Sequence, residues 1–190
     1  MGERAPLDGR PTVIFAGRLV REKGVGVLGE AFQAVVDRVP SARLVVFGEG
    51  PERRLLEQRT AELALRDAVT FAGFVARAEL ERAARSAWVQ VVPSRWDEPF
   101  GNVAAESLMR GTPVVVSGSG GMAEFVNDGE TGRHVTPGDA TMLASAIATL
   151  LEDREANEAM GRNARSFALS HLGFATFADR FLTLYGSLRA

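Results

Sequence analysis

The stretch TVIFAGRLVREKGVG, residues 12–26, decides the fold. Its first part, Thr12–Ala16, is a short apolar run rich in β-branched residues, which predicts a buried strand. A glycine-rich loop follows at once, and a helical pattern runs from about Val27 to Val39. A strand, a loop and a helix in this order begin a βαβ unit, so this region predicts a mostly parallel sheet.

The same alternation continues along the chain. Further strands are predicted at Arg43–Phe47, Val69–Phe71, Trp88–Val92, Val114–Ser117 and Arg133–Val135. Between them, helices are predicted up to about Leu65, over Arg77–Arg85 and over Asn102–Arg110. We therefore expect an α/β fold, a Rossmann-like and doubly wound, mostly parallel six-stranded sheet with flanking helices and a helical C-terminal tail.

The tail carries an apolar stripe at three- and four-residue spacing. The stripe consists of Phe174, Phe177, Phe181, Leu184, Tyr185 and Leu188. Such a stripe predicts a helical face that packs against another surface. With no internal repeat or linker, we expect a polar N-terminal lead over residues 1–10 and a single domain over residues 11–190.

Composition narrows the function classes. The 190 residues are 46% hydrophobic and 24% charged, and the net charge is −2, so no broad cationic field is expected to bind nucleic acid. No apolar run reaches the roughly 18 residues that a membrane span needs, which predicts a cytoplasmic protein. The absence of cysteine and the two distant histidines, His134 and His171, predict no metal site. Only one of the 22 basic residues is lysine, Lys23.

The loops that follow the first two strands are candidates for ligand contacts, because ligands of open α/β sheets bind beyond the carboxyl ends of the strands. Arg18 and Lys23 follow the first strand and together suit a diphosphate. The alternative is a solvated basic turn in which Lys23 or Arg21 pairs with Glu22. The second loop, Gly48–Pro51, lacks the third glycine of a dinucleotide fingerprint, which disfavours an oxidoreductase and leaves a plain tight turn as an alternative.

The loop after the fourth strand is the most informative. Gly101 and Asn102 stand where a helix begins, so free backbone amides and the positive helix end can hold a phosphate. Glu98 precedes the helix, and Glu106 lies about one turn inside it. A carboxylate can accept two hydroxyl hydrogen bonds from a sugar or ribose. The alternative is that Glu106 is a surface residue paired with Arg110 at i+4.

Several motifs occur together in a fixed order and resemble the C-terminal half of a family 4 (group 1) retaining glycosyltransferase of the GT-B fold. They are Gly17-Arg18 with Lys23, Gly48-x-Gly50-Pro51, Pro93-Ser94, Glu98-x7-Glu106 around Pro99-Phe100-Gly101, Gly111-Thr112-Pro113-Val114-Val115, and Gly120-Gly121-x-x-Glu124. The resemblance runs from about Thr12 to Leu151 and more loosely through the tail. Asn102 and Ser107, which replace the more usual Leu and Ala, and Trp96-Asp97 beside Glu98 depart from the family pattern and leave the sugar preference open.

The resemblance implies a role for each matching residue. Arg18 and Lys23 hold the diphosphate of the donor and, with Glu98 against the donor sugar, form the catalytic set. Glu106 binds the ribose hydroxyls. The remaining donor-binding residues are Gly17, Gly48, Phe74 and Val75, of which the last two cradle the base, and Phe100, Gly101, Asn102 and Val103, whose backbone lies near the phosphates or sugar.

The resemblance also implies a partner. An enzyme of this kind has a second, N-terminal domain that binds the acceptor, so we expect this chain to be the donor-binding half and to be inactive alone. It would bind a UDP-, GDP- or ADP-sugar with no metal and no other cofactor. The alternative is a stand-alone, non-catalytic nucleotide-sugar binding module or a subunit of a split glycosyltransferase. Peripheral membrane contact by the full enzyme is left open.

Overall fold

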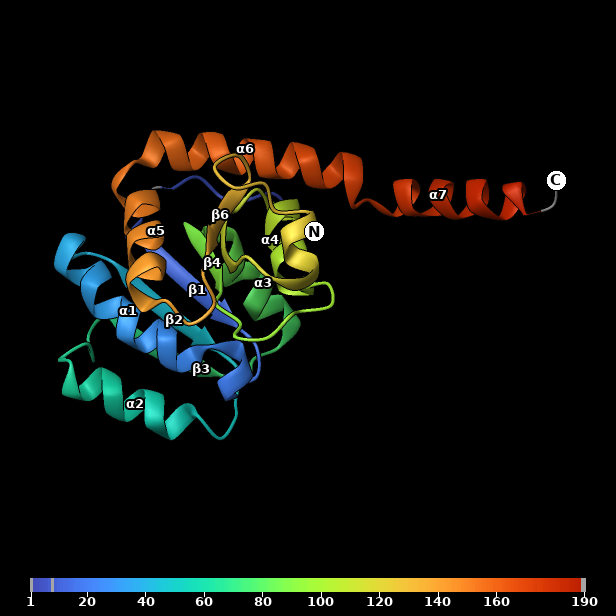
Figure 1. Ribbon diagram of the computed structural model, residues 1–190. Helices are drawn as coiled ribbons and strands as arrows, with labels where there is room; N and C mark the ends of the chain where they lie inside the picture. Colours follow the sequence, from blue (N-terminus) through green and yellow to red (C-terminus); the bar gives the residue numbers. More distant parts are fainter. Residues whose placement is uncertain (1, 8, 189–190) are drawn as a thin grey trace.

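The fold is a single parallel sheet between helical layers (Figure 1), and the computed structural model describes residues 2–7 and 9–188 of the chain. The strands are β1 (Thr12–Ala16), β2 (Arg43–Phe47), β3 (Val69–Gly73), β4 (Val89–Val92), β5 (Val114–Ser117) and β6 (Gly132–Val135). They pair in the order β3-β2-β1-β4-β5-β6, and all neighbours run parallel. The strand order therefore reverses between β1 and β4, which confirms the predicted doubly wound topology.

The helices agree with the sequence except near the first loop and at element ends. They are α1 (Val25–Arg38), α2 (Arg53–Glu62), α3 (Arg77–Ser86), α4 (Asn102–Arg110), α5 (Ala140–Glu152), α6 (Arg154–His171) and α7 (Phe174–Ser187), with short 3-10 turns η1 (Arg21–Lys23) and η2 (Gly120–Glu124). The first helix begins earlier than predicted, because η1 ends in the left-handed Gly24, from which α1 starts directly. Gly111 ends α4 in the left-handed conformation, as predicted.

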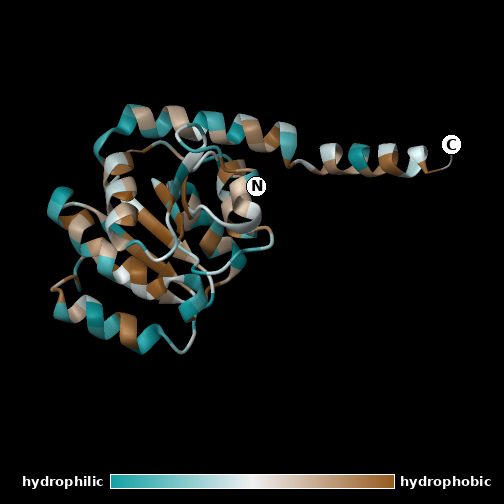
Figure 2. Ribbon diagram, in the orientation of Figure 1, coloured by the Kyte–Doolittle hydropathy of each residue, from teal (hydrophilic) through white to brown (hydrophobic). Residues whose placement is uncertain are grey.

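Alternate side chains of the strands face different helical layers. Val13 and Phe15 of β1 pack with α1 and α5 in the largest core cluster, whereas Ile14 packs with α3. On β5, Val114 and Val116 pack with α4 and α6. Figure 2 shows the strands as the apolar interior. The period of two along each strand thus divides the core into two layers, and the loops at the carboxyl ends of the strands are left free for ligand contacts.

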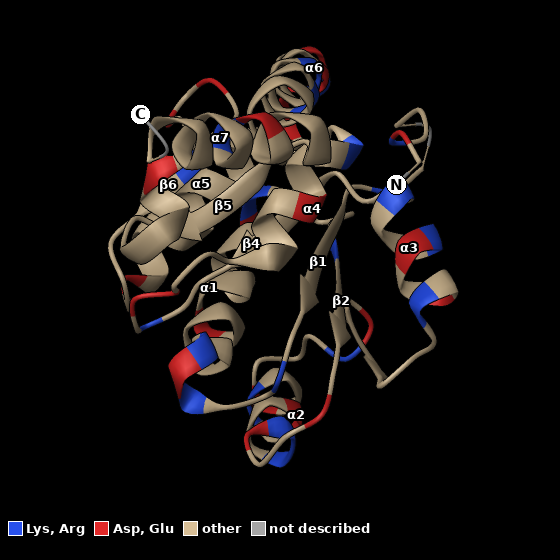
Figure 3. Ribbon diagram, turned by 90° about the vertical axis from the view of Figure 1, so that its right-hand side faces the viewer, with Lys and Arg blue, Asp and Glu red and all other residues tan. Residues whose placement is uncertain are grey.

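Charged side chains of both signs are mixed on the outer helices. Figure 3 shows blue and red segments interleaved along α2 and α3, while the strands are free of charge over most of their length. Ion pairs within α2 and its preceding loop include Arg53 with Glu49 and with Glu57. This mixed pattern fits the small net charge of −2 and gives no broad basic surface on these helices.

The C-terminal helix α7 extends away from the rest of the molecule (Figure 1) and contains no buried residue. Its aromatic rings lie next to one another, with the ring centroids of Phe177 and Phe181 4.6 Å apart. The predicted apolar stripe is therefore present, but among the described residues no surface covers it. Within that same part of the chain, none of the helices has the length and apolar character needed to cross a bilayer.

We expect the chain to self-associate through the exposed face of α7. Phe177 and Phe181 are 56% and 44% exposed. Burying one such side chain contributes about 1.5–3 kcal/mol, so replacing both by serine should weaken self-association at least about tenfold. Sedimentation velocity over a concentration series measures this effect. Leu55→Ser, at a 49% exposed leucine on α2, is the matched control. Equal association of all three proteins would show that α7 is not the contact.

Candidate functional site

Two adjacent cavities lie at the carboxyl ends of the strands. The first, of about 460 Å³, is lined by Phe15, Ala16, Gly17, Arg18, Lys23, Val92, Ser94, Glu98, Pro99, Phe100, Gly101, Asn102 and Val103. The second, of about 410 Å³, is lined by Ala16, Gly17, Arg18, Phe47, Gly48, Glu49, Gly73, Phe74, Val75, Leu80 and Val103. They share Gly17, Arg18 and Val103, so together they form one bipartite candidate site where the strand order reverses.

Two glycines allow the loops of this site to touch. Gly24 has φ 69°, and a side chain there would place its Cβ 1.8 Å from the carbonyl oxygen of Pro93. Gly48 has φ 126°, and its Cβ would lie 1.9 Å from the carbonyl oxygen of Gly17. Only a residue without Cβ fits either position. The first loop is thereby pressed against both the second and the fourth.

The contact between the first and fourth loops brings Lys23 to Glu98. Lys23 Nζ lies 2.5 Å from Glu98 Oε1, and the hydroxyl of Ser94 donates to the same oxygen at 2.5 Å. Lys23 also lies over the ring of Trp96, 5.8 Å from its centroid. Lys23 therefore pairs with Glu98 and not with Glu22, as one form of the solvated-turn alternative had it. The lone lysine belongs to the cavity wall.

These contacts control the charge of Glu98, which is only 6% exposed. Burial acts to raise the pKa of Glu98, but the hydrogen bonds from Lys23 and Ser94 and the charge of Lys23 outweigh it and lower the pKa below its ordinary value. The stabilisation from this ionised group is present above the ordinary glutamate pKa and is lost as the pH falls through the lowered one. At neutral pH the cavity holds a carboxylate beside an ammonium.

The N-terminus of α4 also lines the first cavity. Gly101 precedes the helix with φ 80° and makes no side-chain cap, and Asn102 and Val103 begin the first turn. Backbone N–H groups at such an end carry the positive pole of the helix and suit an anion. Phe100, at the same turn, packs against Phe125 with centroids 5.1 Å apart.

The structure gathers all but one of the predicted site residues around the two cavities. The exception is Glu106, which lines neither; its Oε2 lies 3.3 Å from Arg110 Nη2 and its Oε1 lies 3.7 Å from Arg77 Nη2. The alternative pairing with Arg110 is thus present in the structure. Val103, one turn earlier on the same helix, lines both cavities, so Glu106 lies close to their shared edge.

Sequence reasoning missed the role of Ser94. This side chain is fully buried and donates its hydrogen bond to Glu98, four residues later. The signal was present, because a small hydroxyl residue two positions after a buried strand and four residues before a carboxylate is well placed to donate to it. It also missed Leu80 and Phe47, which provide apolar wall in the second cavity.

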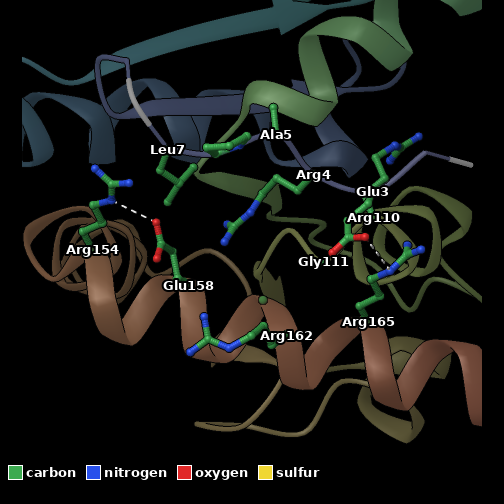
Figure 4. Close-up of a pocket in the computed structure, with 12 residues that line it drawn as sticks. Glu3, Arg4, Ala5, Leu7, Arg110, Gly111, Arg154, Glu158, Arg162 and Arg165 are labelled. Carbon is green, nitrogen blue, oxygen red and sulfur yellow. Dashed lines mark hydrogen bonds and ion pairs between the residues drawn. The ribbon is translucent and has the colours of Figure 1, made fainter.

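A third cavity, of about 410 Å³, lies where the N-terminal segment meets α6 and the end of α4 (Figure 4). Five arginines and two glutamates are among its lining residues, and several of them have polar partners. Arg154 bonds Glu158 at 2.9 Å, Arg165 lies 3.8 Å from Glu3, and Arg4 donates to Asn157 Oδ1 at 2.8 Å. Residues of the predicted polar lead are therefore docked on α6. Among the described residues, no group of three or more potential metal ligands is found.

The chain matches a known protein family over most of its length. The family model described as "Glycosyl transferases group 1" matches residues 3–167. The chain is 32% identical over 183 residues to the alpha-D-kanosaminyltransferase of Streptomyces kanamyceticus, covering 96% of this chain and 47% of that protein. It is 35% identical over 184 residues to a GDP-mannose-dependent alpha-(1-6)-phosphatidylinositol monomannoside mannosyltransferase of Mycobacterium tuberculosis, covering 94% and 48%.

A solved structure is likewise matched by this chain over about half of its own length. HepE of Anabaena, crystallised in complex with UDP and glucose, superposes with a TM-score of 0.84 at 27% identity, covering 95% of this chain and 49% of that one. The chain thus spans about half the length of the relatives that it matches.

Proposed function

The chain belongs to the group 1 glycosyltransferases, and from this premise we propose that it is the donor-binding half of a retaining enzyme of that family. The donor would be a nucleoside-diphosphate sugar, and a second domain would hold the acceptor. The span of about half the length of the relatives supports a half-enzyme. The same span suits the alternative, a non-catalytic module or a subunit of a split glycosyltransferase.

One observation carries the proposal: Arg18, Lys23 and the N-terminus of α4 line a single cavity together with Glu98. A diphosphate in this cavity would face two side-chain cations and a positive helix end. When the bond between the anomeric carbon and the diphosphate breaks, the electron pair goes to the diphosphate oxygen. The cations and the helix end would stabilise the charge that develops there, without need of a metal ion.

The two carboxylates and the second cavity would bind the rest of the donor. Glu98, held ionised beside Lys23, would accept hydrogen bonds from the donor sugar or stabilise positive charge at its anomeric carbon. The second cavity, with its apolar wall of Phe47, Val75 and Leu80, would take the nucleoside. The acceptor hydroxyl would then attack the anomeric carbon from the face that the diphosphate leaves and give up its proton to the departing diphosphate oxygen, which retains the configuration of the sugar.

The proposal predicts that the chain binds a nucleoside diphosphate without divalent metal. Titration calorimetry with UDP, GDP and ADP, each with and without EDTA, should show weak binding of at least one of them, unchanged by the chelator. The affinity should be modest because a second domain would supply part of the cleft. Absence of binding to all three, or binding that strictly requires magnesium, would reject the donor site. Robust glycoside formation by the chain alone would reject the half-enzyme assignment.

A further inference from the structure

A buried arginine at the end of α4 connects two carboxylates. The side chain of Arg110 is 5% exposed. Its Nε and Nη2 donate to Glu81 Oε2 on α3 at 2.9 and 2.7 Å, and its Nη2 also reaches Glu106 Oε2 at 3.3 Å. A buried guanidinium needs compensating partners, and here it has carboxylates from two helices. The position of the Arg110 guanidinium is thus fixed by Glu81, and Arg110 in turn contacts Glu106.

This network leaves the two oxygens of Glu106 in different surroundings. Oε2 faces the buried Arg110, whereas Oε1 is approached only at 3.7 Å by Arg77, whose side chain is 81% exposed. An exposed ion pair at this distance contributes little and is easily displaced. A carboxylate has about four acceptor positions. Oε1 therefore remains able to accept hydrogen bonds from a ligand, while Oε2 is held in place.

The held carboxylate lies beside the second cavity. Val103, one turn before Glu106 on α4, lines this cavity. So do Val75, two residues before Arg77, and Leu80, the residue before Glu81. The same helices α3 and α4 thus provide both the apolar wall of the cavity and the charged network at its edge. A nucleoside in the cavity would place its ribose between that wall and the first, phosphate-facing cavity.

We propose that Arg110, anchored by Glu81, is a positioning residue that holds Glu106 for the vicinal hydroxyls of the donor ribose. This inference rests on the donor-binding function proposed above. Charge-assisted hydrogen bonds with fixed geometry define the position of a carboxylate more sharply than solvent contacts do. Arg110 itself need not touch the nucleotide, because its action on the ribose passes through Glu106.

The test compares two ligands on each variant. Calorimetric affinities are measured for UDP and 2′-deoxy-UDP, and for the corresponding guanosine and adenosine pairs. Unchanged protein should prefer the ribonucleotide about tenfold, since each hydroxyl donates to a charged acceptor. Glu106→Gln and Arg110→Met should each reduce this preference to about threefold or less. Arg110→Lys should recover part of it. Because the affinities for the two ligands are compared on the same variant, a general loss of binding or stability affects both and cancels in their ratio.

Two further variants separate a lost positioning role from misfolding. The double variant Glu81→Met with Arg110→Met removes both charges of the buried pair and leaves neither of them uncompensated. It takes the place of Arg110→Met if that single variant fails to fold. Arg82→Met, at an exposed arginine beside Glu81, is the matched control and should keep the full preference. Loss of preference in Glu106→Gln but not in the Arg110 variants would overturn the positioning role. A folded unchanged protein that binds no nucleotide would instead refute the donor site itself.

Discussion

Lys23→Ala is expected to weaken nucleoside diphosphate binding by about 1.5–3 kcal/mol, roughly ten- to a hundredfold, the range for hydrogen bonds to charged groups. Two losses combine in this variant. The diphosphate loses a cation, and the buried carboxylate of Glu98 loses the ammonium 2.5 Å away that compensates it. Glu98 would then repel the phosphates. Calorimetry with the nucleotide that binds best measures the change, and circular dichroism checks that the variant is folded.

The contribution of Glu98 can be separated from that of the lost cation. If repulsion contributes, adding Glu98→Gln to Lys23→Ala should recover about 1 kcal/mol of affinity, a typical coupling energy between contacting residues. Arg21→Ala is the matched control, because Arg21 belongs to the same turn η1 but is exposed and lines neither cavity. Equal affinity of Lys23→Ala and the unchanged protein would show that the first loop does not hold the diphosphate.

Gly48→Ala is expected to destabilise the domain by about 3 kcal/mol or more. The added Cβ would lie 1.9 Å from the carbonyl oxygen of Gly17, and the backbone at φ 126° disfavours any side chain. Backbone strain and overpacking each cost about 1–3 kcal/mol. Because Gly17 precedes Arg18 in the cavity wall, relief of the clash would also move the cation and lower nucleotide affinity.

Chemical denaturation measures the free energy of unfolding, with Gly26→Ala as the matched control. Gly26 is an exposed residue of α1, and a Cβ there meets no atom within 4 Å. Alanine at this helical position should stabilise the domain by about 0.5–1 kcal/mol. We therefore expect Gly48→Ala to lower the free energy of unfolding and Gly26→Ala to raise it. If both variants are as stable as the unchanged chain, the second loop is not packed against the first in the way described.

Local sequence patterns were sufficient for the elements and for most of the candidate site. Short β-branched runs and helical periods depend on neighbouring residues, so the six strands of the sheet and the stop of α4 at Gly111 follow from the chain alone. The rule that ligands meet the carboxyl ends of parallel strands then placed Arg18, Lys23 and Glu98 together without any knowledge of distances. The resemblance to glycosyltransferases added the roles of these residues.

The partners of individual side chains were decided by the tertiary structure. Lys23 and Glu98 are 75 positions apart, and they meet because β1 and β4 are neighbours in the sheet and Gly24 lets their loops touch. Arg110 on α4 donates to Glu81 on another helix, α3. The C-terminal helix α7 extends away from the domain with its aromatic face uncovered. Periodicity specifies which face of an element is apolar, but contacts between distant segments depend on strand order and helix packing, which no local pattern encodes.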